Sequence, residues 1–249
     1  MLTAITCTGD RPICFGLLQK WVASQTVHPD QWIVVDDGAI PVETEGNFEY
    51  IRRAPRKSDP EFTIILNLQE AFVHLRGDKI LFLEDDEYYA AGYIGEMSAR
   101  LDRYDIVGIG RSKYYHLPTS RWYRFSNMGY ASLAHTGFNR IFFSEAKRCL
   151  EGSPFFDIRL WEKVNGRNAS RITLSGKTKS YISRGKKGLI FDDAEKNLYV
   201  GMKGLPGRKG IGIGHGDEIR YCPDTENILR KWIPDDDAYG EYIRLKGGD

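Results

Sequence analysis

The chain has 249 residues and enough apolar side chains for one large or two closely fused small domains with a real core. Its net charge of +1 excludes an overall field that would commit it to nucleic acid or to an acidic partner. The four cysteines are scattered without a C-x-x-C pair, which argues against a zinc site or a disulfide framework and indicates reduced thiols.

Residues 1–6 lack the charged-then-apolar profile of a secretory signal peptide. No segment approaches the roughly 20 apolar residues that a membrane-spanning helix needs. We therefore expect a soluble, cytoplasmic protein.

The first 110 residues alternate between apolar segments of strand length and segments with helical periodicity. We expect strands at residues 2–7, 31–35, 48–51, 79–83 and 105–109, and helices at residues 12–24, 61–75 and 91–101. This alternation predicts a Rossmann-like α/β fold with a mainly parallel central sheet.

The fourth expected strand carries the most informative pattern in the chain. Ile80–Leu83 is a continuous apolar run, as in a strand buried on both faces, and Glu84, Asp85, Asp86 and Glu87 follow it directly. Acidic side chains packed together at the end of such a strand repel one another unless a cation lies among them. The pattern indicates a site for a divalent cation, with a solvated acidic loop as the alternative.

Polar clusters follow three of the expected strands. Thr8–Arg11 ends the first strand, Asp36 and Asp37 end the second, and Glu84–Asp86 ends the fourth. In parallel sheets, ligands bind beyond the carboxyl ends of the strands. We therefore expect these three clusters to lie along one edge of the sheet.

The second half of the chain has a different character. Aromatic residues crowd positions 114–130, and we expect a strand that passes into a short helix at 140–150 and a further helix at 156–164. Every charged residue from 166 to 190 is basic, and seven glycines lie in a loop-like segment from 201 to 216.

These shifts in composition divide the chain into three parts. Residues 1–110 form the expected ligand-binding half of one domain, and residues 111–216 form a second half with the basic stretch and the glycine-rich loop. Residues 217–249 form a polar tail with one expected helix at 227–232.

The motifs at the strand ends resemble those of the GT-A glycosyltransferases, and their layout is most similar to the large family-2 group. Members of that family have a Thr-containing turn after the first strand, an Asp-Asp-Gly-Ser-like motif after the second, and a D-x-D motif after a later strand. This chain offers Thr8, then Asp36-Asp37-Gly38, then Glu84-Asp85-Asp86. The resemblance covers about residues 1–165. It implies a GT-A fold with an acceptor-side extension, a nucleoside diphosphate sugar (UDP-sugar favoured) as the donor, and Mn²⁺ or Mg²⁺ as the cofactor.

The resemblance also implies a set of nucleotide-binding residues near these strand ends: Thr8, Asp10, Arg11, Asp36, Asp37, Asn67 and Asp85. Asp37, or Asp36, would accept a hydrogen bond from the base, and an Asx turn is the structural alternative. Arg11 would pair with phosphate or remain an ordinary surface cation. Asn67 stands where the family usually has an Ala-Arg-Asn start, so the arginine of that motif is missing.

For the metal, the resemblance implies Asp86 and Glu84 as carboxylate ligands and His215 as an additional ligand. His215 lies in the glycine-rich segment, whose glycines permit closure and whose cations suit a diphosphate. A structural or merely exposed histidine is the alternative. Two other acidic runs, Asp192-Asp193 and Asp235–Asp237, compete for the metal, and the second has the pattern of a solvated helix start.

Asp157 is the expected general base, because inverting members of the family carry a carboxylate at the start of a helix in the acceptor half. It lies between an apolar pair and an amphipathic helix, where partial burial would raise its pKa. Phe156 replaces the glutamate of the usual acidic pair. The alternative role of Asp157 is to cap the helix.

The basic stretch supplies candidate acceptor-binding residues, namely Arg167, Arg171, Lys177 and Lys179. In this respect the chain resembles the phage enzymes that glycosylate hydroxymethylated pyrimidines in DNA. DNA is therefore one expected acceptor, with the host cytoplasm as the location of a phage-encoded protein. A saccharide or protein hydroxyl is the competing acceptor, and a non-catalytic nucleic-acid-binding module is the third interpretation.

Overall fold

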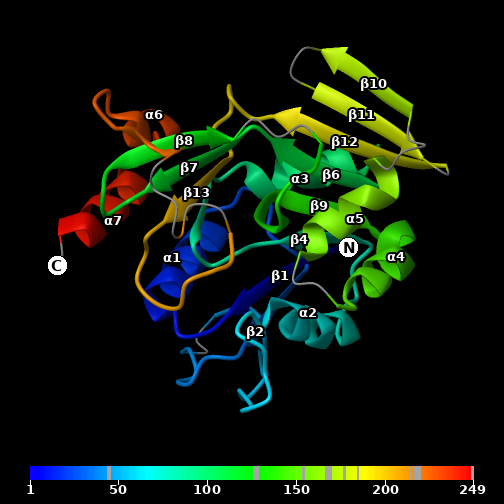
Figure 1. Ribbon diagram of the computed structural model, residues 1–249, viewed down its shortest axis with the longest axis horizontal. Helices are drawn as coiled ribbons and strands as arrows, with labels where there is room; N and C mark the ends of the chain where they lie inside the picture. Colours follow the sequence, from blue (N-terminus) through cyan, green and yellow to red (C-terminus); the bar gives the residue numbers. More distant parts are fainter. Residues whose placement is uncertain are drawn as a thin grey trace.

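The computed structural model describes residues 1–43, 46–125, 129–152, 155–165, 170–175, 178–183, 185–212, 215 and 220–247. For residues 165, 170–175, 182 and 183 it describes the backbone alone. Within these residues the chain forms two β-sheets, and helices cover both faces of the larger one (Figure 1). None of the described helices is both long and apolar enough to cross a membrane.

The larger sheet contains nine strands: β1 (Leu2–Thr8), β2 (Gln31–Asp36), β3 (Glu49–Arg52), β4 (Lys79–Phe82), β6 (Ile106–Gly110), β9 (Thr136–Asn139), β10 (Ser170–Ser175), β11 (Thr178–Ser183) and β12 (Lys186–Asp192). The smaller sheet contains five: β5 (Glu87–Tyr89), β7 (Ser112–His116), β8 (Arg121–Phe125), β13 (Tyr199–Lys203) and β14 (Cys222–Pro223). The α-helices are α1 (Pro12–Ala23), α2 (Ile64–Val73), α3 (Tyr93–Leu101), α4 (Phe143–Cys149), α5 (Phe156–Asn165), α6 (Ile228–Trp232) and α7 (Asp236–Gly247). Two 3₁₀-helices, η1 (Leu133–His135) and η2 (Arg140–Phe142), flank β9.

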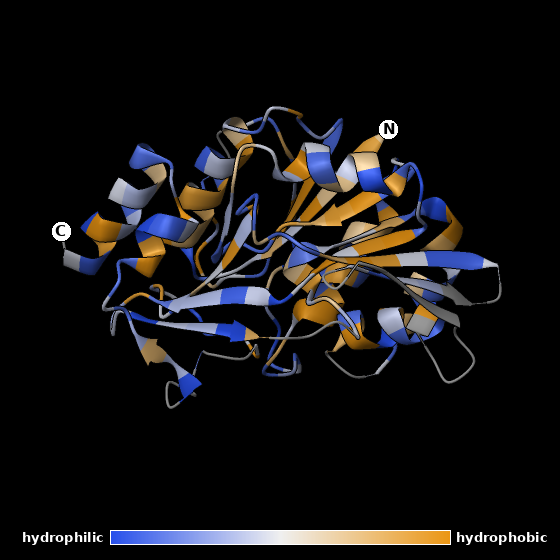
Figure 2. Cartoon of the chain, turned by 90° about the horizontal axis from the view of Figure 1, so that it is seen from above, coloured by the Kyte–Doolittle hydropathy of each residue, from blue (hydrophilic) through white to orange (hydrophobic). Residues whose placement is uncertain are grey.

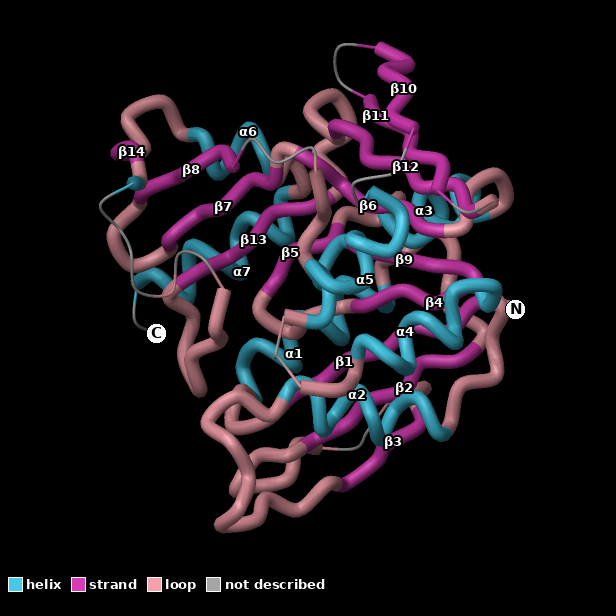
Figure 3. The backbone as a smooth tube through the Cα atoms, turned by 45° about the vertical axis from the view of Figure 1, so that its right-hand side comes forward, coloured by secondary structure: helices cyan, strands magenta, loops and turns pink. Residues whose placement is uncertain are grey.

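The larger sheet has the strand order β10-β11-β12-β6-β9-β4-β1-β2-β3. Seven of these nine strands run in the same direction, and β9 and β11 run the opposite way. The α/β fold with a mainly parallel central sheet that the sequence predicts is confirmed. The hairpin of β10 and β11 extends the sheet at one edge (Figure 3).

The smaller sheet has the order β14-β8-β7-β13-β5. Residues 83–86 link β4 of the larger sheet directly to β5 of the smaller one, so the acidic loop lies where the two sheets meet (Figure 3). Strands from the second half of the chain complete both sheets, because β12 pairs with β6 and β13 pairs with β5 and β7.

The apolar run of β4 is divided between two cores, one on each face of the larger sheet. Leu81 and Leu83 pack into a cluster with side chains of α1, α3, α6 and α7. Ile80 and Phe82 pack into a second cluster with side chains of α2, α4 and α5. Two-sided burial explains why a continuous apolar run forms a central strand. The central strands are mostly coloured as hydrophobic in Figure 2.

The second half differs most from the sequence prediction. The strand expected at the start of 140–150 is β9, which ends at Asn139, and η2 and α4 fill that range instead. The loop expected from residue 201 begins after Lys203, because Gly201–Lys203 belongs to β13. The sequence does not predict β7, which is buried along its whole length although it contains a lysine and a histidine. It also misses α7 in the tail.

Gly108 in β6 offers a test of this packing. A Cβ atom there would overlap Ala131 and lie 2.7 Å from Trp161 Cζ2. Replacing Gly108 by alanine should therefore lower the free energy of unfolding by about 1–3 kcal/mol, the usual cost of overpacking. Gly16→Ala is the matched control, because no atom lies within 4 Å of its added methyl group, and it should leave stability unchanged or slightly raised. Chemical denaturation of both variants measures the difference.

Candidate active site

The acidic loop after β4 packs against the turn after β1. Thr8 Oγ1 donates a hydrogen bond of 2.7 Å to Asp85 Oδ2. Arg11 Nη1 lies 2.8 Å from Asp85 Oδ1 and 3.1 Å from Asp86 Oδ2. Burial opposes the charge on Arg11, but the carboxylates of Asp86 and Asp85 outweigh it and hold the Arg11 pKa above its ordinary value. Two of the three polar clusters expected at one edge of the sheet therefore meet.

A second buried cation neutralises Glu87. Lys203 Nζ lies 2.8 Å from Glu87 Oε1, and both side chains are almost fully buried. The other oxygen, Glu87 Oε2, accepts a hydrogen bond of 2.8 Å from the backbone N–H of Met202. Burial opposes the charge on Lys203, but Glu87 and Asp86 hold its pKa above the ordinary value. The sequence places Lys203 on a glycine-rich loop, whereas the structure places it in a strand and in an ion pair.

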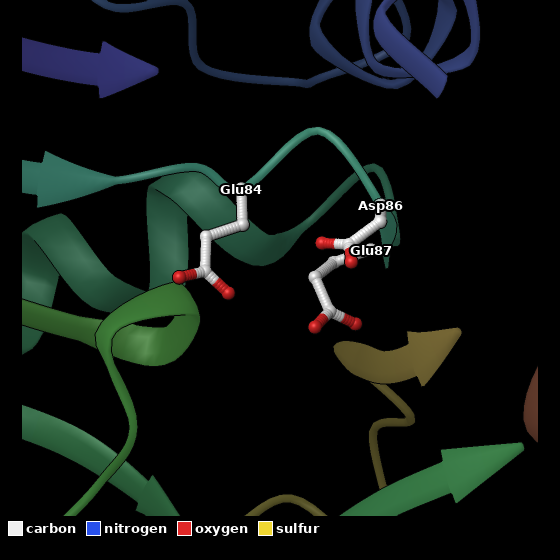
Figure 4. Close-up of side chains that lie close together, drawn as sticks. All are labelled: Glu84, Asp86 and Glu87. Carbon is white, nitrogen blue, oxygen red and sulfur yellow. The ribbon is translucent and has the colours of Figure 1, made fainter. Parts of the chain in front are cut away.

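Three carboxylates of the acidic loop could hold a metal ion. The ligand atoms of Glu84, Asp86 and Glu87 lie within 4.8 Å of one another (Figure 4). Glu87 already uses both oxygens, which leaves Glu84 and Asp86 as ligands. This donor set fits Mg²⁺ or Mn²⁺, which take one or two carboxylates together with phosphate oxygens.

His215 lies next to this group. Its Nε2 atom is 3.5 Å from Asp86 Oδ2. Burial, and then the charge of Lys203, lower the pKa of His215 to about 4, so its ring is neutral at pH 7 and able to act as a ligand. The histidine that the sequence suggests as an additional ligand is therefore near the acidic loop.

The two competing acidic runs have structural partners. Asp193 pairs with buried Lys113 at 3.0 Å, and Asp192 pairs with Arg111 at 3.3 Å. Asp235 Oδ1 accepts a hydrogen bond of 2.8 Å from the backbone N–H of Ala238 in the first turn of α7. These contacts fit ion pairing and helix capping, and they support the acidic loop as the metal site.

Asp36 organises a turn and does not line the cavity described below. Its Oδ1 accepts a hydrogen bond from the backbone N–H of Gly38 (2.8 Å), and its Oδ2 accepts from the N–H of Val42 (2.9 Å) and from Tyr50 Oη (2.8 Å). Its side chain is fully buried. The hydrogen bond from Gly38 is the Asx-turn alternative that the sequence left open for Asp36.

Asp37 is held by two arginines. Arg53 Nη2 donates to Asp37 Oδ2 at 2.7 Å, and Arg208 forms an ion pair with Asp37 Oδ1. Burial opposes the charge on Asp37, but hydrogen bonds from Arg208, Thr63 and Arg53 outweigh it and lower the Asp37 pKa. Its carboxylate meets these partners, and Asp37 is not among the residues that line the cavity.

Asp10 and Asn67 are connected to the same region. Asp10 Oδ1 accepts a hydrogen bond of 2.7 Å from the backbone N–H of Ala39, so it ties two turns together, and Asp10 does not line the cavity. Asn67 is buried and its Oδ1 accepts a hydrogen bond from Arg53 Nε. Arg53 thus provides an arginine beside Asn67, although the motif at the start of α2 lacks one.

Asp157 lies in the first turn of α5, as the sequence predicts. Its carboxylate accepts backbone hydrogen bonds at this helix start and from Leu133, so it also caps the helix. Burial is the larger effect and raises the pKa of Asp157 to about 6 despite these hydrogen bonds. A carboxyl group with this pKa is suited to accept a proton near neutral pH.

A single cavity of about 410 Å³ connects these groups. The sequence-predicted site residues that line it are Thr8, Arg11, Asn67, Glu84, Asp85, Asp86, Asp157 and His215. Glu87 and Lys203 also line it, as do Arg208 and Lys209 of the segment that follows β13. The cavity therefore combines an acidic loop, several basic side chains and a carboxyl group of raised pKa.

The predicted acceptor-binding residues are not part of this cavity as far as the structure describes them. Arg167 and Lys177 lie outside the described residues, and the side chain of Arg171 on β10 is not described. Lys179 lies on β11 and does not line the cavity. Arg171 and Lys179 thus lie on the hairpin at one edge of the larger sheet.

Comparisons with known proteins point to one fold. Neither a protein family nor a curated protein matches the sequence. Among solved structures, S. aureus TarS 1-349 in complex with UDP-GlcNAc is similar, with a TM-score of 0.52 and 12% identity over 84% of this chain and 60% of that chain. Another S. aureus TarS structure gives a TM-score of 0.51 and 12% identity over 81% of this chain and 36% of that chain.

The chain therefore shares its fold with a protein that has been crystallised with a nucleotide sugar. At this identity the likeness concerns the fold alone. The chain spans between about a third and about three fifths of the TarS chains that it matches.

The sequence did not predict the partners of two residues of the site. Lys203 is buried against Glu87, which lies 116 positions away, so local sequence offers no signal for the pair. Arg53 belongs to a run of basic residues that reads as a solvated loop, yet it joins Asp37, Asn67 and Asp59. The one local signal for these partners is the position of Lys203 at the end of the apolar strand β13.

The Lys203–Glu87 pair should be important for stability. Replacing Lys203 by methionine leaves the Glu87 charge buried without its partner, so the free energy of unfolding should fall by about 3–5 kcal/mol. Adding Glu87→Gln keeps the acceptor for Met202 N–H and should recover most of the loss. Lys20→Met removes an exposed partner of Glu241 and should cost less than about 1 kcal/mol. Denaturant unfolding compares the three; an equal loss in all would contradict a special role for the buried pair.

Proposed function

We propose that the chain is a metal-dependent glycosyltransferase that moves a sugar from a nucleoside diphosphate donor to a hydroxyl group of an acceptor. The observation that carries this proposal is the cavity in which the acidic loop, the basic side chains and Asp157 meet. Such a transfer needs stabilisation of a leaving diphosphate and a base for the attacking hydroxyl. The same cavity contains candidate residues for both requirements.

The diphosphate is bound through the cations that line the cavity. Arg11 and Lys203 are fixed by their carboxylate partners, so they offer positive charge that is already oriented. Arg208 and Lys209 contribute two further cations from the segment after β13. Thr8 and Arg11 hold Asp85 in place, which gives Asp85 a supporting role in orienting Arg11.

Glu84 and Asp86 would hold the Mg²⁺ or Mn²⁺ ion, with His215 beside Asp86. When bound, the ion supplies Lewis-acid stabilisation of the negative charge on the leaving diphosphate. Burial and the neighbouring carboxylates raise the pKa of Glu84 well above its usual range, which supports a need for additional positive charge there.

Asp157 acts as the base. It takes the proton from the acceptor hydroxyl while that oxygen bonds to the anomeric carbon and the bond to the diphosphate breaks. A direct attack of this kind inverts the configuration at the anomeric carbon. We favour UDP as the nucleotide, because the fold is similar to that of TarS, which was crystallised with UDP-GlcNAc.

DNA as the acceptor has no support among the described residues. Of the cations that suggested it, Arg171 and Lys179 lie on the edge hairpin, and Lys179, the one whose side chain is described, does not line the cavity. The acceptor hydroxyl must reach Asp157 inside the cavity, so we leave the DNA-modifying interpretation aside.

Calorimetry with UDP, with and without Mn²⁺, tests the proposed function. We expect UDP to bind, and to bind at least about tenfold more tightly when Mn²⁺ is present, a difference of about 1.4 kcal/mol. Asp236→Asn is the control, because it changes an exposed carboxylate at the start of α7. Binding of UDP that is indifferent to Mn²⁺ would remove the metal from the proposal, and the absence of any UDP binding would refute the donor class.

A further inference from the structure

The cavity has an apolar wall around Asp157. Phe155, Phe156 and Ile158, the neighbours of Asp157 along the chain, line the cavity, as do Tyr130 and Leu133. Leu133 donates its backbone N–H to the Asp157 carboxylate. Burial, and then the charge of Asp157, raise the pKa of Tyr130. Two further aromatic rings, Phe62 and Phe125, line the same cavity.

The cations that line the cavity are paired with or lie near residues other than Asp157. Arg11 pairs with Asp85 and Asp86, and Lys203 pairs with Glu87. Arg208 pairs with Asp37, and Lys209 lies close enough to His215 to contribute to its lowered pKa, after burial and larger charge effects. Among the described lining residues, we therefore assign the positively charged side chains to the part of the cavity that binds the donor.

The charge near Asp157 disfavours an anionic acceptor. Asp157 is itself an acidic residue of the cavity lining. A phosphate or carboxylate brought to Asp157 would meet a like charge, while the lining cations Arg11, Lys203 and Arg208 are paired with other carboxylates. An uncharged group meets no such penalty.

The shape of the wall suits a ring with apolar faces. Phe155 is 44% exposed and Ile211 is 38% exposed, and both line the cavity, so apolar surface extends to its solvent-facing part. Aromatic side chains offer broad flat faces, while Asp157 and Ser132 provide polar groups among them. A sugar ring has C–H faces for the aromatic surface and hydroxyl groups at its edge for the carboxylate.

We propose that the acceptor is an uncharged sugar ring, which lies against the aromatic wall formed by Tyr130, Phe155 and their neighbours and presents a hydroxyl group to Asp157. This assignment of the acceptor class rests on the proposed glycosyltransferase function. It predicts that neutral saccharides bind to this wall whether or not the donor is present.

Saturation-transfer NMR with a panel of neutral methyl glycosides and oligosaccharides tests the wall directly. We expect transfer to the ring C–H protons of at least one saccharide. Phe155→Ala should weaken its binding by about tenfold, in line with the energy of a contact to an aromatic face, whereas Phe155→Tyr should retain it. Ile141→Ala is the matched control, because Ile141 is 57% exposed and lies outside the cavity.

Release of UDP from a mixture of UDP-sugars, with the same saccharides or with duplex DNA added, gives the second readout. Stimulation by a neutral saccharide supports both proposals. Saccharide binding without any UDP release keeps the saccharide wall and refutes the transferase. UDP release that only DNA stimulates, or that no saccharide stimulates while none binds, overturns the acceptor assignment and keeps the transferase.

Discussion

Replacing Asp157 by asparagine is expected to lower sugar transfer by about 10²- to 10⁴-fold, the range that general acid–base catalysis contributes. The amide keeps the size of the side chain and one acceptor oxygen for the helix start, but it cannot take a proton. In the unmodified protein burial raises the Asp157 pKa to about 6. The base works only when ionised, so kcat/KM should fall as the pH drops below about 6 and level off above it. The variant should lose this acid limb, which is the fall in kcat/KM at low pH. UDP release measured across the pH range tests this expectation.

Donor binding provides the control for this experiment. The Asp157→Asn variant should bind UDP and Mn²⁺ as the unmodified protein does, because Asp157 contacts neither group in the proposal. Glu162→Gln alters an exposed carboxylate on the same helix and should transfer normally. An asparagine variant with full activity and an intact acid limb would contradict the assignment of the base.

Asp86→Asn is expected to abolish the effect of Mn²⁺ on UDP binding. It should also lower kcat by about 10²- to 10³-fold, which is the usual effect of losing one electrostatic contact to a transition state. The substitution removes one of the two carboxylates available to the ion and lowers the negative charge next to Arg11 and His215. Calorimetry measures the first effect and UDP release the second.

Asp86 also neutralises buried Arg11, so its loss affects stability as well as metal binding. Thermal unfolding of the variant separates the two effects. Asp192→Asn is the matched control, since it removes a carboxylate that pairs with an arginine at the end of another strand. If turnover falls while the response to Mn²⁺ is unchanged, Asp86 acts through folding and is not a metal ligand.

The parallel part of the fold was predictable because its signals are local. The uniform apolar run before Glu84 marks a strand buried on both faces, and Pro12 marks the start of α1. The strand order then brings the turn after β1 next to the loop after β4. This neighbourhood is why Thr8, Arg11 and Asp85 were identified together from the sequence.

The second half was less predictable because its strands do not follow a simple hydrophobic period. β7 buries Lys113 and His116, which the pattern of a half-buried strand would leave exposed. Lys113 is tolerated because Asp193 pairs with it from 80 positions away. No local sequence pattern indicates an ion-pair partner at that distance along the chain.

The same limit applies to the two aspartates at the end of β2. Two adjacent aspartates before a glycine are consistent both with a ligand contact and with a turn that binds its own backbone. The choice depends on Tyr50, Arg53 and Arg208, which reach these carboxylates from elsewhere in the chain. The sequence identified the location, and the tertiary partners determined the role.

The ion pairs of Glu87 with Lys203 and of Asp37 with Arg208 join residues 116 and 171 positions apart. During synthesis, β1 to β4 therefore leave the ribosome long before either partner exists. A nascent or truncated chain that ends before residue 203 carries these carboxylates without Lys203 and Arg208. The central sheet can begin to assemble early, but the charge balance of the cavity is completed only when the last fifth of the polypeptide has been translated.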